Sequence, residues 1–130
     1  MNTKLLMTSS SLALGLAGIV SLFAPDSLFS ILNAPITRQS LLSIQMMGAL
    51  YFSFALMNWA AKDSAIGGVY ARPVSLANFG HFLIGTLLLA KYQLSNEFNP
   101  AIVVILIVYA IFVSLFYWLV FRATGIAVAK

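Results

Sequence analysis

The 130-residue chain has no cysteine, one histidine and only three acidic residues. The absence of cysteine excludes disulfides, thiolate nucleophiles and cysteine-ligated zinc or iron–sulfur sites. Charged residues make up 8% of the sequence, against about 25% in an ordinary soluble domain. So few charges cannot cover a water-facing surface, and the mean hydropathy of +0.99 fits a bilayer as the solvent. The composition therefore predicts an integral membrane protein.

Long apolar runs fill most of the sequence. A helix needs about 20 apolar residues to cross the hydrocarbon core of a bilayer. Four runs satisfy this requirement: residues 5–24, 41–61, 74–90 and 101–121. They leave no room for a soluble catalytic domain, so we predict a single transmembrane domain over residues 1–130, an all-α four-helix bundle with antiparallel neighbours. We expect the first run to be retained as a membrane anchor, and a cleavable signal peptide is the alternative.

The segment between the first two runs has the features of a short interfacial helix. Pro25 suits the first turn of a helix, and Asp26 is favoured near the positive helix start. Leu28, Phe29 and Leu32 share one face, which we expect to lie on the membrane surface. An ordinary ordered loop is the alternative for this segment.

Basic residues are distributed unevenly between the two ends of the spans. Five lie on one side, Lys4, Lys62, Arg72, Arg122 and Lys130, and two on the other, Arg38 and Lys91. Because the more basic side of a membrane protein faces the cytoplasm, we predict cytoplasmic termini, in a bacterial inner membrane. Basic residues scattered singly near helix ends suit the anionic headgroups of membrane lipids, and no nucleic-acid partner is expected.

Small and polar residues mark the faces expected to pack inside the bundle. Helices in lipid associate through close approach at small residues and through interhelical hydrogen bonds. Four glycines lie on such stripes and are predicted helix-packing positions: Gly15 and Gly18 in the first span, Gly48 in the second and Gly85 in the third. The fourth span is bulky on nearly all faces. We expect it to be the most lipid-exposed helix, or the one that meets another subunit.

His81 is the only side chain in the spans that titrates near neutral pH. The short connection between the second and third spans places Asn58 and Asn78 at similar depth, with His81 one turn deeper. We predict a ligand-binding pocket made by these three residues, with Tyr51 as a further candidate and Arg72 at its cytoplasmic mouth. Intramembrane ionisable residues are functional candidates, but a structural, hydrogen-bonded histidine remains the alternative.

The same residues exclude most chemistry at this pocket. Zinc usually takes three or four protein ligands, and the acidic residues Asp26, Asp63 and Glu97 all lie outside the four apolar runs. We therefore expect no metal, no cofactor and no catalytic triad. A bis-histidine haem would require His81 from two subunits.

Two stretches carry a resemblance to a known family: MGALYFSFALMNWAAKD and, after a short loop, ARPVSLANFGHFLIGTLLLA. Together they resemble small four-span bacterial membrane proteins of the DoxX-like kind. The resemblance rests on small, polar and aromatic residues of the second and third spans: Asn58, Trp59, Asn78, Gly80, His81 and Gly85. It implies a four-span fold and an accessory role beside respiratory or redox systems, and it implies no catalytic residue.

Three functions are compatible with these features. The first is a non-enzymatic accessory, scaffold or oligomerising subunit, which would form a homo-oligomer or join a larger membrane complex through the fourth span or the Gly15/Gly18 face. The second is a binder or carrier of a small apolar molecule, such as a quinone, lipid or isoprenoid, with its polar head at the pocket around His81. The third is a membrane enzyme that uses His81 as a lone acid or base with partner groups from the loops.

Overall fold

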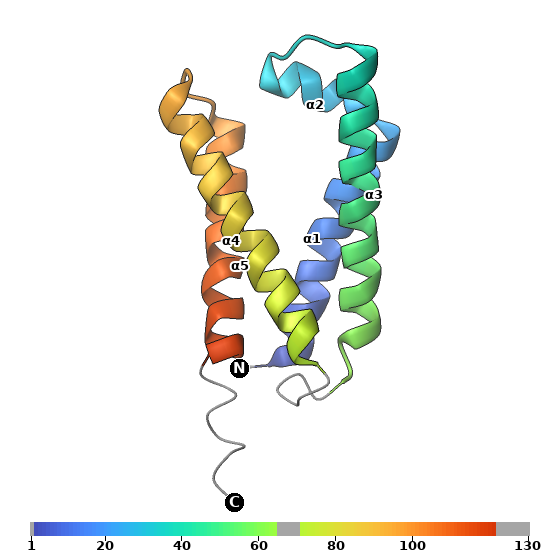
Figure 1. Cartoon of the computed structure of the whole chain (residues 1–130), viewed down its shortest axis with the longest axis vertical. Helices are drawn as coiled ribbons and strands as arrows, with labels where there is room; N and C mark the ends of the chain where they lie inside the picture. The colour runs from blue at the N-terminus through green and yellow to red at the C-terminus, as the bar shows by residue number, and fades with distance from the viewer. Residues whose placement is uncertain (1, 65–70, 122–130) are drawn as a thin grey trace, which may run out of the picture. The chain divides into compact units, whose positions relative to one another are not determined.

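The computed structural model describes residues 2–64 and 71–121. Five helices form this part of the chain: α1 (Thr3–Phe23), α2 (Pro25–Leu32), α3 (Arg38–Ala61), α4 (Arg72–Ser95) and α5 (Pro100–Phe121), drawn in Figure 1. The described residues contain no strand, and the prediction of an all-α protein is confirmed. Two of the basic residues used to predict the orientation, Arg122 and Lys130, lie outside the described residues.

Four of these helices are long and apolar enough to cross a membrane: α1, α3, α4 and α5. They contain 21 to 24 residues, so each is about 32 to 36 Å long at a rise of about 1.5 Å per residue. This length matches a hydrocarbon core of about 30 Å. The predicted set of four membrane-spanning helices is therefore confirmed.

The helices α3 and α4 extend beyond the apolar runs because polar residues cap them. α3 begins at Arg38 in a reciprocal cap, where the Ser40 backbone N–H donates to Thr37 Oγ1 at 3.1 Å and the Thr37 N–H donates to Ser40 Oγ at 2.9 Å. α4 continues to Ser95, and Asn96 Nδ2 then donates to the Tyr92 carbonyl at 2.9 Å. Such caps satisfy backbone groups that the helix end leaves unpaired.

The chain divides into two compact units, Met1–Asp63 and Ser64–Lys130. The first unit contains α1, α2 and α3, and the second contains α4 and α5. Each is described separately below. The single transmembrane domain over residues 1–130 stays a prediction.

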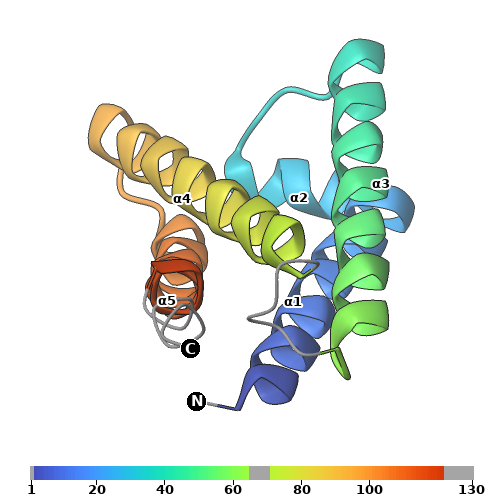
Figure 2. The ribbon, with the colours of Figure 1, turned by 60° about the horizontal axis from the view of Figure 1, so that its bottom comes forward.

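In the first unit, α1 and α3 lie side by side and antiparallel (Figures 1 and 2). Their closest approach is at two glycines. A Cβ added at Gly18 would lie 2.8 Å from the Phe52 backbone nitrogen and 2.9 Å from the Gly48 carbonyl oxygen. One added at Gly48 would lie 2.8 Å from Ser21 Cβ. The two backbones therefore touch, which is the arrangement by which small residues join helices in lipid.

α2 is a regular helix that lies across the C-terminal end of α1 and the N-terminal end of α3 (Figure 1). Pro25 occupies its first turn, and Asn33 ends it with a left-handed φ of 51°, from which its N–H reaches the Phe29 and Ser30 carbonyls. The predicted helix is confirmed, and the loop alternative is wrong. Of the predicted apolar face, Phe29 is buried and Leu28 and Leu32 are half-buried, so this face packs in part within the structure. The placement of α2 on the membrane surface stays a prediction.

In the second unit, α4 and α5 are antiparallel neighbours that cross each other (Figures 1 and 2). Phe82 of α4 is buried and stacks on two rings of α5, Phe112 at 4.7 Å and Phe116 at 5.8 Å between ring centroids. Gly85 lies directly against the ring of Tyr109, because a Cβ added there would be 2.7 Å from Tyr109 Cδ1. α5 thus buries an aromatic face on α4 and exposes a second face.

Candidate functional site

The five residues of the predicted pocket are divided between the two units. Tyr51 and Asn58 lie on α3 in the first unit, and Arg72, Asn78 and His81 lie on α4 in the second. Within α4, Asn78 and His81 are one turn apart. Arg72 is exposed at the first position of the helix, about 13 Å from His81 along the axis. Arg72 is therefore not a direct neighbour of His81.

Asn58 joins α3 to α1 through hydrogen bonds. Its amide Nδ2 donates to Ser10 Oγ at 3.1 Å, and Ser10 Oγ donates in turn to the Met7 carbonyl at 3.0 Å. Asn58 and Ser10 are fully buried. Ser11 makes a parallel link by donating to the Ala55 carbonyl at 2.7 Å. A buried amide is costly unless its groups are paired, so these contacts give Asn58 a packing role. Tyr51 is half-buried on the same helix.

Asn78 and His81 occupy different local settings on α4. Asn78 is fully buried, and its Nδ2 donates to the Val74 carbonyl of its own helix at 2.9 Å. His81 is half-buried, and its Nε2 lies 3.4 Å from the Tyr109 hydroxyl oxygen on α5. Which of the two donates depends on the imidazole tautomer. The imidazole also lies against the rings of Phe82 at 5.1 Å and Tyr109 at 5.7 Å between centroids.

Tyr109 is the residue of this site that sequence reasoning missed. It was read as one of the bulky side chains of the fourth span, yet it lies near the middle of α5. Tyrosines of membrane proteins gather at the two membrane–water interfaces, so a tyrosine at mid-span is unusual and indicates a specific contact for its hydroxyl. The structure explains its position, because Gly85 leaves room for the ring and His81 meets its hydroxyl.

The hydroxyl–imidazole pair stands beside a cluster of aromatic rings: Phe82, Tyr109, Phe112 and Phe116. Such a pair can exchange hydrogen bonds with a carbonyl or hydroxyl group, while the rings offer an apolar surface. Within residues 2–64 and 71–121, no group of three or more histidine, cysteine, aspartate or glutamate side chains is placed to hold a metal ion.

No protein-family model, curated protein or solved structure is detectably similar to this chain. The resemblance to DoxX-like proteins therefore stays a prediction.

Proposed function

We propose that this chain is a non-enzymatic accessory or scaffold subunit of a bacterial inner membrane. It would form a homo-oligomer or part of a larger membrane complex, with both termini in the cytoplasm. Two observations support the setting: four helices have membrane-spanning length, and basic residues are concentrated at one set of helix ends.

The exposed face of α5 is the observation that carries this proposal. In the N-terminal half of α5, four β-branched side chains are exposed at helical spacing: Val104, Ile107, Val108 and Ile111. Valine and isoleucine already have one strongly preferred χ1 rotamer in a helix, so packing them against another helix costs little further side-chain entropy. Lipid tails are as apolar as these side chains, so close packing rather than hydrophobicity decides association. The face therefore suits a partner helix.

The other surface predicted to meet a partner is already occupied. Gly18 lies against Gly48 and Phe52 of α3, and a Cβ added at Gly15 would lie 3.5 Å from Ala55 Cβ. The glycine face of α1 thus packs within the first unit. This leaves the β-branched face of α5 as the surface for a subunit contact.

Because the chain has no cysteine, single cysteines test this surface without background. We would oxidise membranes containing Val104→Cys, Ile107→Cys or Ile111→Cys and compare them with Leu12→Cys on the exposed side of α1. We expect cross-linked dimers, or a cross-link to a second protein, from the α5 positions alone. Monomer from every α5 position, with no co-purifying protein in native mass spectrometry from lipid nanodiscs, would contradict the proposal.

A second function, binding of a small apolar molecule with a polar head, is favoured by the contact between His81 and Tyr109. We would compare the masses that co-purify with the wild type, His81→Leu and Tyr109→Phe, with Tyr92→Phe as a control for the loss of an exposed tyrosine hydroxyl. A ligand of a few hundred daltons should be lost from the first two variants and kept by the control. Equal retention in all four proteins would rule this function out.

A further inference from the structure

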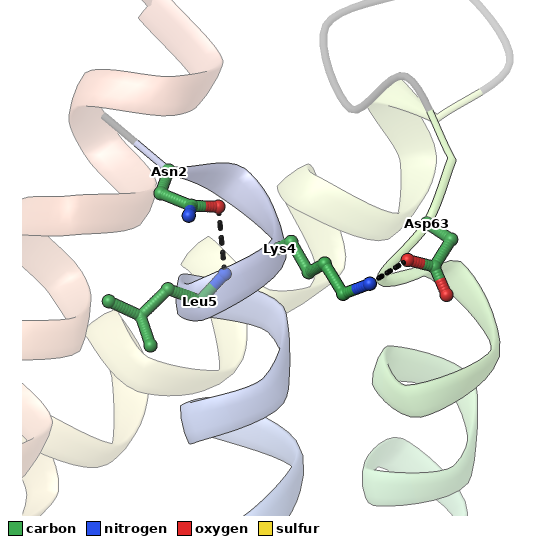
Figure 3. Close-up of polar contacts among 4 residues, drawn as sticks. All are labelled: Asn2, Lys4, Leu5 and Asp63. Atoms are coloured by element: carbon green, nitrogen blue, oxygen red, sulfur yellow. Dashed lines mark hydrogen bonds and ion pairs between the residues drawn. The ribbon is translucent and has the colours of Figure 1, made fainter.

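Four side chains gather where α1 begins and α3 ends: Lys4, Trp59, Lys62 and Asp63. Lys4 Nζ lies 2.7 Å from Asp63 Oδ1, as Figure 3 shows. Lys62 Nζ lies 3.0 Å from the centroid of the Trp59 ring. We call these four residues the end cluster. It combines two cations, one anion and an aromatic ring at the boundary of two membrane-spanning helices.

Helix electrostatics explain how the charges of the end cluster are distributed. Lys4 stands in the first turn of α1 and Asp63 follows the end of α3. Each charge has the sign that its own helix dipole disfavours, and each is neutralised by the other. Lys62 is the C-cap of α3, where a cation is favoured. The Lys62 backbone N–H donates to the Trp59 carbonyl at 3.4 Å. This tight last turn places the Lys62 ammonium over the Trp59 indole.

The end cluster therefore has one positive charge in excess, and it is on Lys62. The hydrogen bond from Lys4, together with the positive charges of Lys4 and Lys62, holds the pKa of the exposed Asp63 carboxyl below its ordinary value. Asp63 thus stays ionised at neutral pH and forms the ion pair with Lys4. The charge of Lys62 is matched by no carboxylate within 4.0 Å in the part of the chain that the structure describes.

Lys62 and Trp59 also present side-chain hydrogen-bond donors. The ammonium has three N–H groups and the indole has one. Among residues 2–64 and 71–121, neither side chain takes part in a hydrogen bond, and the indole side chain of Trp59 is 49% exposed. Tryptophan at a membrane boundary sits at the level of the headgroups, and lysine extends its ammonium to the same level. The donors are thus at the depth of lipid phosphates.

We propose that Lys62 and Trp59 bind the phosphate group of an anionic phospholipid in the leaflet at this end of the helices. The phosphate would accept from the Lys62 ammonium and the Trp59 indole N–H, and its charge would match the excess cation. A zwitterionic lipid carries its own cation beside the phosphate, so it gains less from Lys62. Asp63 limits the site to one lysine, because it already holds Lys4.

Energy transfer from Trp59 measures this binding directly. The chain has two tryptophans, so a Trp118→Phe background leaves Trp59 as the single donor. The protein is placed in phosphatidylcholine vesicles that contain a trace of pyrene-labelled phosphatidylglycerol or pyrene-labelled phosphatidylcholine. One lysine near the membrane surface gives about a fivefold preference for the anionic lipid around Trp59. We expect Lys62→Gln to remove this preference and Asp63→Asn to increase it, because Lys4 is then released.

Lys91→Gln is the matched control, because it removes an exposed lysine of the second unit and should leave the preference unchanged. A preference that survives Lys62→Gln, or equal transfer to both lipids in the parent protein, would overturn the proposal. Excess inorganic phosphate is compared with chloride at equal ionic strength. If phosphate alone abolishes the preference, the site takes free phosphate and the assignment to a lipid is wrong.

Discussion

The contact between Gly18 and α3 allows a quantitative test of the packing in the first unit. In Gly18→Ala, the new Cβ would lie 2.8 Å from the Phe52 backbone nitrogen and 2.9 Å from the Gly48 carbonyl oxygen. Backbone atoms cannot rotate away, so α1 and α3 must move apart locally. Overpacking of this kind costs about 1–3 kcal/mol, and we expect the upper part of that range because both obstacles are backbone.

Two other glycines are matched controls for the same substitution. A Cβ at Gly15 would lie 3.5 Å from Ala55 Cβ, which is an ordinary contact, and one at Gly80 would have no neighbour within 4 Å. Alanine is favoured over glycine in a helix by about 1 kcal/mol, and this gain is common to all three variants. The difference between Gly18→Ala and Gly15→Ala therefore isolates the overpacking, at about 1–3 kcal/mol.

Reversible unfolding in mixed detergent micelles, followed by circular dichroism, measures these free energies. We expect Gly18→Ala to unfold at lower denaturant than the wild type, and Gly15→Ala and Gly80→Ala to unfold at the same or higher denaturant. Equal stability of Gly18→Ala and Gly15→Ala would show that the backbones of α1 and α3 do not touch at this position.

Three further predictions concern polar residues. The substitutions Ser10→Ala and Asn58→Ala should couple in a double-mutant cycle by about 0.6 kcal/mol, the average for an interhelical hydrogen bond in a membrane; additive effects would contradict the bond. Lys4 lowers the pKa of Asp63 in the folded protein. The ion pair therefore contributes fully to stability above the unfolded pKa of about 4, and this contribution is lost as the pH falls through the lower folded pKa. When stability is measured against pH in acid, Asp63→Asn should lack this loss. Asn96→Cys should react with an impermeant maleimide from outside the cell and Ser64→Cys only after permeabilisation, and the reverse pattern would overturn the predicted orientation.

The four membrane-spanning helices could be predicted from sequence because the thickness of a bilayer sets their length and hydropathy reports it. The start of α3 and the end of α4 could not, since the groups that extend these two helices are polar. Thr37 and Ser40 lengthen α3, and Asn96 binds the end of α4. A hydropathy reading counts these residues against the helix, although each satisfies a backbone group that would otherwise lack a partner.

The pairing of helix faces was harder to predict than the faces themselves. The stripes of small residues in the sequence include Gly18 and Gly48, which meet in the structure. The sequence argument also placed α3 beside α4 because their connection is short, and it assigned Asn58 to a pocket with residues of α4; both stay predictions. It predicted antiparallel neighbours, but hydropathy and small-residue stripes did not single out Ser10 as the acceptor for Asn58.

These contacts also change which residues a ligand-binding function would depend on. The Asn58 amide donates to Ser10 of α1 and so takes part in the packing of the first unit, whereas the Asn78 amide donates to the Val74 carbonyl of its own helix. His81 Nε2 lies 3.4 Å from the Tyr109 hydroxyl, a group that can itself donate or accept. An incoming carbonyl or hydroxyl could hydrogen-bond to this pair, whereas displacing the buried Asn58 amide would break its hydrogen bond to Ser10. Tyr109 is therefore a further residue to test for the ligand-binding hypothesis, and Tyr109→Phe tests it without breaking the hydrogen bond between Asn58 and Ser10.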